Sequence, residues 1–192
     1  MKKALILCRE GKMLHAIQNC TASLDYSEIT VFHTAAAARN AAGSIRPGDY
    51  QLAIVNAPLA DEFGSNLVKF LYEQLDIPSL FLVPGEQAKS TTDFLIDLPC
   101  FVIPKPVNVN TLEQSIQLAF DAFQKMAILN RKNRSLQEKL DDLKVIDRAK
   151  CVLISVLNMN ESQAHRYIQK KAMDERVKPR VIADNILKTY EY

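Results

Sequence analysis

Glycine is scarce in this chain of 192 residues and is unevenly placed. All five glycines lie between Gly11 and Gly85, so the second half has few residues suited to tight turns. From Leu112 to Lys178 there is neither glycine nor proline. We therefore expect a first half with frequent turns and a second half that is all helix.

The chain also lacks the residue clusters of a cofactor, metal or catalytic site. Its four cysteines (Cys8, Cys20, Cys100 and Cys151) form no C-x-x-C pair, and widely spaced cysteines of this kind are usually small buried hydrophobes in a reducing compartment. There is no Gly-rich phosphate loop and no spacing typical of metal ligands. We predict a protein that is not an enzyme and that holds no cofactor or metal.

Long apolar runs are missing as well. The run at residues 4–8 is too short for a signal peptide, because charge returns at Arg9 and Glu10. No segment is long enough to span a bilayer. We expect a soluble, cytoplasmic protein that makes no membrane contact.

Charge divides the chain in the same way as glycine. Residues 1–129 hold 10 Lys or Arg against 13 Asp or Glu, a balance of −3, whereas residues 130–192 hold 14 against 9, a balance of +5. The formal net charge of +2 hides this difference. Only the second part is biased towards polyanionic partners.

The first part alternates short apolar runs with helical patterns. A wholly apolar run of about five residues is typical of a strand covered on both faces. Strand and helix alternate five times, which favours a doubly wound, parallel five-stranded sheet with helices on both faces. The expected strands are residues 4–8, 28–32, 52–56, 79–83 and 100–103.

Two motifs make this part similar to a known family. Lys105-Pro106, in the sequence PKPV (104–107), matches the signature lysine and proline of the receiver domain of two-component response regulators. Gly64 stands eight residues beyond Asn56, the family's spacing from phosphoacceptor aspartate to glycine. The resemblance covers roughly residues 1–124 and implies a receiver-like, flavodoxin-like α/β domain.

The same resemblance implies that the phosphorylation site is degenerate. Cys8 and Arg9 stand where receivers carry the acidic pair that binds magnesium, Asn56 replaces the phosphoacceptor aspartate, and Val83 replaces a hydroxyl residue. An amide is not the carboxylate nucleophile that acyl-phosphate formation needs, and few carboxylates are left to hold magnesium. We predict a pseudo-receiver that is not phosphorylated in the usual way.

Three further interpretations concern the same site. Arg9 is hypothesised to supply a positive charge where the metal would sit. Lys105 is interpreted as a retained feature of the fold whose partner is gone. Asp61, five residues past Asn56, is the nearest spare carboxylate, and phosphorylation there is kept as an alternative.

The helix that starts near Leu112 continues into a heptad pattern. Positions a are Ala119, Met126, Asn133 and Leu140, and Ala122, Leu129, Leu136 and Leu143 are at d. Leucine at d with one asparagine at a is typical of a parallel two-stranded coiled coil. We predict a coiled-coil linker at residues 125–146 and a homodimer; the alternative is an amphipathic helix that folds back on its own domain. The expected dimer contacts are Met126, Leu129, Asn133, Leu136, Leu140 and Leu143.

Residues 147–192 have the pattern of a three-helix bundle. Asn158 and Asn160 interrupt the helical period, and Asn160 is a plausible N-cap. Pro179 suits the first position of a last helix. We expect apolar residues of all three helices to close a small core.

Three motifs in this part resemble the ANTAR domain, the RNA-binding output module of certain response regulators. They are A-K-x-x-L (149–153), N-E-S-Q-A (160–164) and I-x-x-x-A-M (168–173), and their spacing is matched throughout about residues 146–192. The family often joins this module to a receiver through a coiled coil. The resemblance implies binding to tandem hairpins in nascent messenger RNA and transcription antitermination.

The charge of the bundle is compatible with RNA. Residues 148–180 hold eight Lys or Arg against three acids, a balance that suits phosphate binding. The apolar stripe of the middle helix (Ala164, Tyr167, Ile168, Ala172) points the Tyr167 ring towards the core, so we expect no base-stacking platform there, and His165 is interpreted as a surface or capping group. The candidate RNA contacts are Arg148, Lys150, Arg166, Gln169, Lys170 and Arg176.

Two alternatives stay open. One is a DNA-binding response regulator with a helix-turn-helix end, which often has a glycine in its turn. The other is an adaptor whose pseudo-receiver binds a sensor or regulatory protein.

Overall fold

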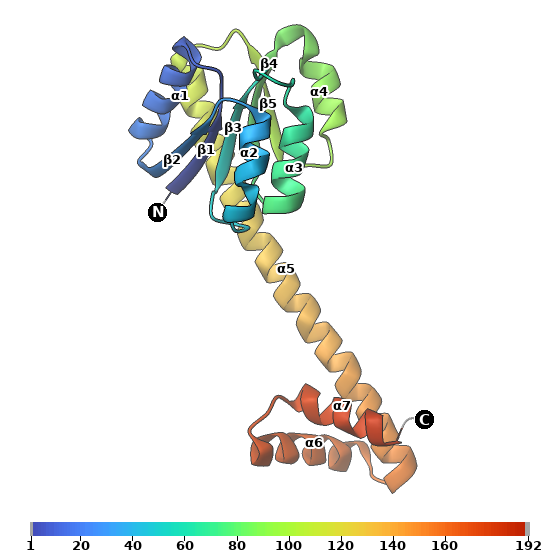
Figure 1. Ribbon diagram of the computed structural model, residues 1–192. Helices are drawn as coiled ribbons and strands as arrows, with labels where there is room; N and C mark the ends of the chain where they lie inside the picture. Colours follow the sequence, from blue (N-terminus) through green and yellow to red (C-terminus); the bar gives the residue numbers. More distant parts are fainter. Residues whose placement is uncertain (1, 191–192) are drawn as a thin grey trace. The chain divides into compact units, whose positions relative to one another are not determined.

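The structure is a computed structural model that describes residues 2–190. The chain forms two compact units that meet between Ala127 and Ile128. In Figure 1 the first unit is a sheet flanked by helices, and the second contains α6, α7 and the last part of α5. None of the helices in residues 2–190 is long and apolar enough to cross a membrane.

The five predicted strands are present and all pair in parallel. The sheet order is β2-β1-β3-β4-β5, and β1 pairs with both β2 and β3. This confirms the predicted doubly wound, receiver-like sheet. The strands are β1 (Lys2–Leu7), β2 (Tyr26–Phe32), β3 (Leu52–Asn56), β4 (Ser79–Pro84) and β5 (Cys100–Lys105).

Helices cover both faces of the sheet because successive strand residues point to opposite sides. Leu5 and Val55 belong to one buried cluster, with residues of α2 and α3, whereas Ile6 and Ile54 belong to the other, with residues of α1 and α5. Figure 1 shows α2, α3 and α4 together on one side of the sheet. The helices of this unit are α1 (Lys12–Ser23), α2 (Ala35–Ala41), α3 (Ser65–Leu75), α4 (Ala88–Phe94) and the beginning of α5 (Val109–Leu157), with short 3-10 turns at Ala42–Ser44 and Gly85–Gln87.

Two side chains hold the N-terminus of α2. The Thr34 hydroxyl accepts a hydrogen bond from the Ala37 amide at 3.2 Å, and the Asp61 carboxylate accepts from the amides of Ala35 and Ala36, both at 2.8 Å. These groups satisfy amides that have no partner within the helix. Asp61 is therefore a helix-capping residue in this fold.

Helix α5 is continuous over 49 residues and belongs to both units. Both predicted domain boundaries, after residues 124 and 146, lie inside it. Ala119 is 1% exposed and packs in the core of the first unit with Phe123. Ala119 matches heptad position a, but it lies before the predicted linker at residues 125–146, and this turn of the helix faces the sheet of its own unit.

The second unit is the predicted three-helix bundle. Its helices are the end of α5, α6 (Glu161–Glu175) and α7 (Pro179–Tyr190). Asn160 caps α6 in a reciprocal capping box with Gln163, and Arg176 ends the helix in the left-handed conformation, with φ of 54°. The buried core residues are Ala149, Leu153, Ala164, Ile168, Ala172, Ile182, Ala183 and Ile186.

One face assignment in α6 is wrong. Ala164, Ile168 and Ala172 are buried as expected, but Tyr167 is 38% exposed. An α-helix turns by about 100° per residue. Viewed down the helix axis, Tyr167 is therefore about 100° from Ile168, whereas Ala164 and Ala172 are each about 40° from Ile168.

Asp61 gives the stability of the first unit a specific dependence on pH. The amides of Ala35 and Ala36 lower the pKa of this carboxyl below its ordinary value of 3.8. Its stabilising effect is therefore fully present above that value and is lost as the pH falls through the lower pKa of the folded state. An Asp61→Asn variant does not titrate, so its deficit in unfolding free energy should shrink as the pH falls from about 5 to about 2. Urea unfolding of both proteins measures this deficit, and a deficit that is constant with pH would contradict it.

Candidate functional site

Residues from three strands meet at the carboxyl edge of the sheet. Cys8 follows β1, Asn56 ends β3 and Lys105 ends β5. The Lys105 ammonium donates to Asn56 Oδ1 at 3.0 Å and also to the Ala57 carbonyl. Asn56 Nδ2 donates to Cys8 Sγ at 3.4 Å. Three of the five predicted residues of the degenerate phosphorylation site, Cys8, Asn56 and Lys105, are therefore in contact with one another.

This contact set corrects one interpretation of Lys105. The lysine does have partners. The Asn56 amide oxygen accepts a hydrogen bond from Lys105, at the position where a receiver domain has an aspartate oxygen. Burial lowers the pKa of Lys105, and burial raises the pKa of the Cys8 thiol against the opposing effects of Asn56 and Lys105. Val83 is fully buried in the hydrophobic core. Its hydrocarbon side chain provides no hydroxyl group at this edge of the sheet.

The loop between β3 and α3 is held from three sides. Arg9 Nη2 donates to the carbonyl of Leu59. Glu62 forms a bidentate ion pair with Arg39 of α2, at 2.8 and 3.0 Å. Asp61 is engaged with the N-terminus of α2. The loop is thus tied to Arg9, just after β1, and to α2 by side-chain contacts.

These residues do not fit a magnesium ion. Magnesium takes oxygen ligands, with carboxylates prominent among them, and the site offers a thiol, a guanidinium and an amide oxygen that already accepts from an ammonium. The nearest carboxylate, Asp61, has both oxygens bound to backbone amides. Residues 2–190 also contain no group of three or more His, Cys, Asp or Glu side chains that could hold a metal.

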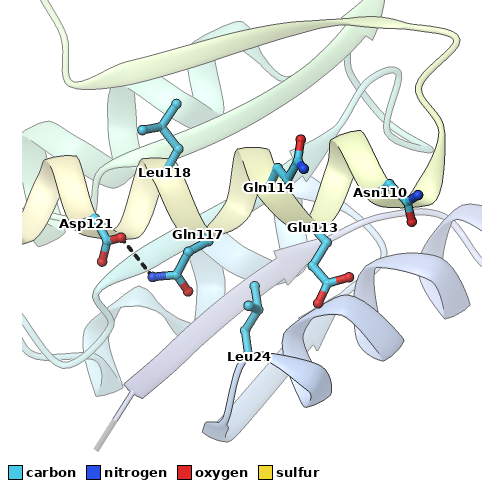
Figure 2. Close-up of a pocket in the computed structure, with 7 residues that line it drawn as sticks. All are labelled: Leu24, Asn110, Glu113, Gln114, Gln117, Leu118 and Asp121. Atoms are coloured by element: carbon cyan, nitrogen blue, oxygen red, sulfur yellow. Dashed lines mark hydrogen bonds between the residues drawn. The ribbon is translucent and has the colours of Figure 1, made fainter.

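A second feature of this unit is a groove beside α5, which the sequence analysis did not single out. Its volume is about 550 Å³, and in Figure 2 the side chains of Glu113 and Gln117 project from α5 towards Leu24, the residue that ends α1. Gln117 Nε2 donates to Asp121 Oδ2 at 2.9 Å. Leu118 is 65% exposed. The groove is lined by Leu24, Asn110, Glu113, Gln114, Gln117, Leu118 and Asp121.

In the second unit, the predicted RNA contacts fall into two groups. Lys150 is engaged within the protein: its ammonium lies 2.7 Å from Asp147 and 3.4 Å from Glu161, and the hydrogen bond with Asp147 raises its pKa. Arg148 is exposed two positions earlier on α5. The carboxylates of Asp147 and Glu161 already neutralise the Lys150 ammonium. Lys150 is therefore better placed to join α5 to α6 than to bind a phosphate.

Arg166 and Lys170 form the second group. Both are exposed and stand four residues apart on α6, so they share its outer face. Neither has an ion-pair partner among the residues that the structure describes. Gln169 is half-buried beside them, and Arg176 is exposed at the end of the helix. This face presents uncompensated positive charge.

Arg166 also lines a small hollow of about 280 Å³ at the start of α6. Lys150, Glu161, Ser162 and His165 complete its lining. His165 is exposed, in agreement with its interpretation as a surface group. Lys150 and Arg166 are thus brought together here, although they come from different helices.

The leucines of the predicted seam are exposed. Leu129, Leu136, Leu140 and Leu143 are 60, 57, 53 and 56% exposed, and Asn133 is exposed between them. Met126 is half-buried and packs against the core of the first unit. A row of exposed apolar side chains is typical of an interaction surface.

One contact that the sequence did not predict joins α7 to α5 outside the row of exposed leucines. Arg180 Nη1 of α7 lies 2.7 Å from Asp142 Oδ1 of α5, and this contact raises the pKa of Arg180. Asp142 stands at heptad position c, outside the seam. In the sequence these residues are an acid and a base 38 positions apart. Their spacing gives no reason to pair them.

Comparison with known proteins finds a family match in the second unit. Residues 134–187 match the family model described as the ANTAR domain. The chain is 33% identical over 85 residues to the transcriptional regulatory protein PdtaR of Mycobacterium tuberculosis, covering 44% of this chain and 42% of that protein. It is 30% identical over 94 residues to the aliphatic amidase regulator of Pseudomonas aeruginosa, covering 48% of each. The matches thus span less than half of these relatives' lengths.

Solved structures give the fold of the first unit. A CheY-like receiver domain protein from Methanospirillum hungatei superposes with a TM-score of 0.55 at 20% identity, covering 66% of this chain and 98% of that one. The non-phosphorylated HemR receiver domain from Leptospira biflexa gives 0.54 at 19% identity, covering 62 and 94%. This chain thus joins a receiver-like fold in its first unit to residues 134–187 that match the ANTAR domain, and in this combination it is similar to the ANTAR-domain response regulators.

Proposed function

We propose that this chain is an RNA-binding transcription antitermination regulator that acts on hairpins in nascent messenger RNA. The observation that carries the proposal is the outer face of α6, where Arg166 and Lys170 are exposed and unpaired within a matched ANTAR domain. Cations without internal partners are available to phosphate groups. The relatives are described as a transcriptional regulatory protein and an amidase regulator, which supports a regulator rather than an enzyme.

We further propose that the first unit is a pseudo-receiver. Asn56 provides no carboxylate nucleophile, and its amide is hydrogen-bonded on one side to Lys105 and on the other to Cys8. Arg9 and Lys105 each donate to a carbonyl of the β3–α3 loop. Two fixed cations therefore stand where a receiver uses an exchangeable metal and phosphoryl group, and the output does not depend on phosphorylation.

Dimerisation through α5 completes the proposal. A parallel coiled coil would cover Leu129, Leu136, Leu140 and Leu143, with Asn133 of each copy paired at an a position. A dimer carries two copies of the α6 face, which suits a target with two hairpins. Such a regulator meets its RNA in the cytoplasm.

A second candidate role concerns the first unit alone. The groove beside α5 combines an exposed leucine, Leu118, with Glu113 and Asp121. Two carboxylates repel RNA but suit a basic protein segment. A sensor or regulatory protein is therefore the partner that we propose for this unit.

Removal of two cations from α6 tests the RNA interface. The Arg166→Ala, Lys170→Ala double variant should bind a two-hairpin RNA, selected with the wild-type chain from a pool with randomised loops, at least about tenfold more weakly. The slope of log affinity against log salt should fall by roughly 1.5 to 2, because about two phosphate contacts are lost. Filter binding over a series of salt concentrations measures both quantities.

The matched control is the Arg46→Ala, Lys89→Ala variant, which removes the same charge from the first unit. Its affinity and salt slope should equal those of the wild type. Equal losses in both double variants would mean that net charge rather than the α6 face binds RNA. Tighter binding of the wild type to duplex DNA of the same charge than to the RNA would refute the RNA assignment.

Substitution in the seam tests dimerisation. The Leu136→Lys, Leu143→Lys variant places four charges in the proposed dimer interface, so it should be monomeric where the wild type is a dimer, with the dissociation constant raised by at least about a hundredfold. Both leucines are exposed in the single chain, so its folding should be unaffected. Leu118→Lys, an exposed leucine outside the seam, should stay dimeric. Sedimentation equilibrium decides, and a wild-type chain that is monomeric at about 100 μM would contradict the proposal.

A further inference from the structure

We propose that α6 carries a stacking site for an unpaired nucleobase, built on the ring of Tyr167 with Lys171 beside it. This inference rests on the proposed RNA-binding function and adds a base-reading element to it. Arg166 and Lys170 contact phosphates, which are the same in every RNA. A ring that stacks on an extruded base would make the protein selective for RNA loops that contain unpaired bases.

The first observation is that the bundle core does not use the Tyr167 ring. Ala164, Ile168 and Ala172 fill the contact of α6 with its neighbours, whereas Tyr167 is 38% exposed. Within residues 2–190 its ring makes no contact with another aromatic ring. A large aromatic side chain that is half-open to water has one face and edge available to a ligand.

The second observation is the position of a cation next to the ring. Lys171 Nζ lies 5.9 Å from the centre of the Tyr167 ring. The same ammonium is 3.9 Å from Glu175 Oε1, at the edge of ion-pair range. A cation at this distance is attracted to the π face of the ring, and it adds positive charge beside the proposed stacking site.

The third observation is proximity to the phosphate-binding residues. Tyr167 follows Arg166 directly and precedes Lys170 by three positions, so one turn of α6 carries the ring and both cations. Proteins that read single-stranded loops commonly combine a basic surface with aromatic side chains on which splayed bases stack. The sequence pattern assigns Tyr167 to the buried apolar stripe because its spacing fits the helical period. In the structure Tyr167 lies at the edge of that stripe and is exposed.

The test uses the full chain and the selected two-hairpin RNA, with 2-aminopurine placed in turn at each purine of the loops. Tyr167→Ala should lower affinity roughly 5- to 150-fold, the range for loss of one stacked base, and leave the salt slope unchanged. Tyr167→Phe keeps the ring and should bind within about twofold of the wild type. One loop position should be quenched by the wild type and by Tyr167→Phe but not by Tyr167→Ala.

Two controls separate stacking from other effects. Tyr190→Ala removes another exposed tyrosine from the same unit, which is 41% exposed, and should bind like the wild type. Tyr167→Leu keeps an apolar side chain that supports the helix without a stacking face. It should bind as weakly as Tyr167→Ala while melting like the wild type.

The outcomes are distinct. Wild-type affinity and quenching in Tyr167→Ala or Tyr167→Leu would overturn the stacking site, and so would a loss of affinity in Tyr167→Phe equal to that in Tyr167→Ala. A failure of the RNA-binding function itself has another signature: Lys170→Ala then changes neither affinity nor salt slope. If Tyr167→Ala is unfolded, the comparison of Tyr167→Leu with Tyr167→Phe decides.

Discussion

Two hydrophobic cores in this protein share one helix. Ile116 of α5 is buried against the sheet of the first unit, and Leu153 of the same helix is buried in the C-terminal bundle. Between them α5 has no glycine or proline, so nothing interrupts its hydrogen bonding. Its apolar surface is divided accordingly: the first part packs on the sheet, the last part packs on α6 and α7, and the leucines between them are exposed in the single chain.

The proposed pseudo-receiver rests on the contacts at the carboxyl edge of the sheet. Lys105 still reaches the end of β3, but it meets an amide rather than a carboxylate. Arg9 and Asp61 both bind backbone groups, one on the β3–α3 loop and the other at the start of α2. Arg9, Asp61, Asn56 and Lys105 are thus each engaged in hydrogen bonds within the protein.

Much of this fold follows from simple patterns in the sequence. The five strands are short apolar runs, and each lies within about two residues of its predicted position. Continuity of α5 follows from the absence of glycine and proline, and the start of α6 from Asn160, whose capping box is present. Local physics decides these features, because each depends on residues close together in the chain.

The rest depends on distances that a sequence does not contain. The partner of Lys105 lies 49 positions away, and Asp142 and Arg180 are separated by 38. Tyr167 fits the helical period, yet the buried core of the bundle does not include it and its ring stays 38% exposed. The helical pattern gives the approximate face of the helix, and packing decides what that face meets.

The central claim is that RNA binding by this protein does not need phosphorylation. The most direct test is to titrate the full chain with the selected two-hairpin RNA at constant magnesium, with and without acetyl phosphate, and to analyse the protein by mass spectrometry. The predicted result is one affinity under both conditions and no phosphoryl group on the protein. Binding that appears only with acetyl phosphate, together with a phosphorylated side chain, would contradict this account.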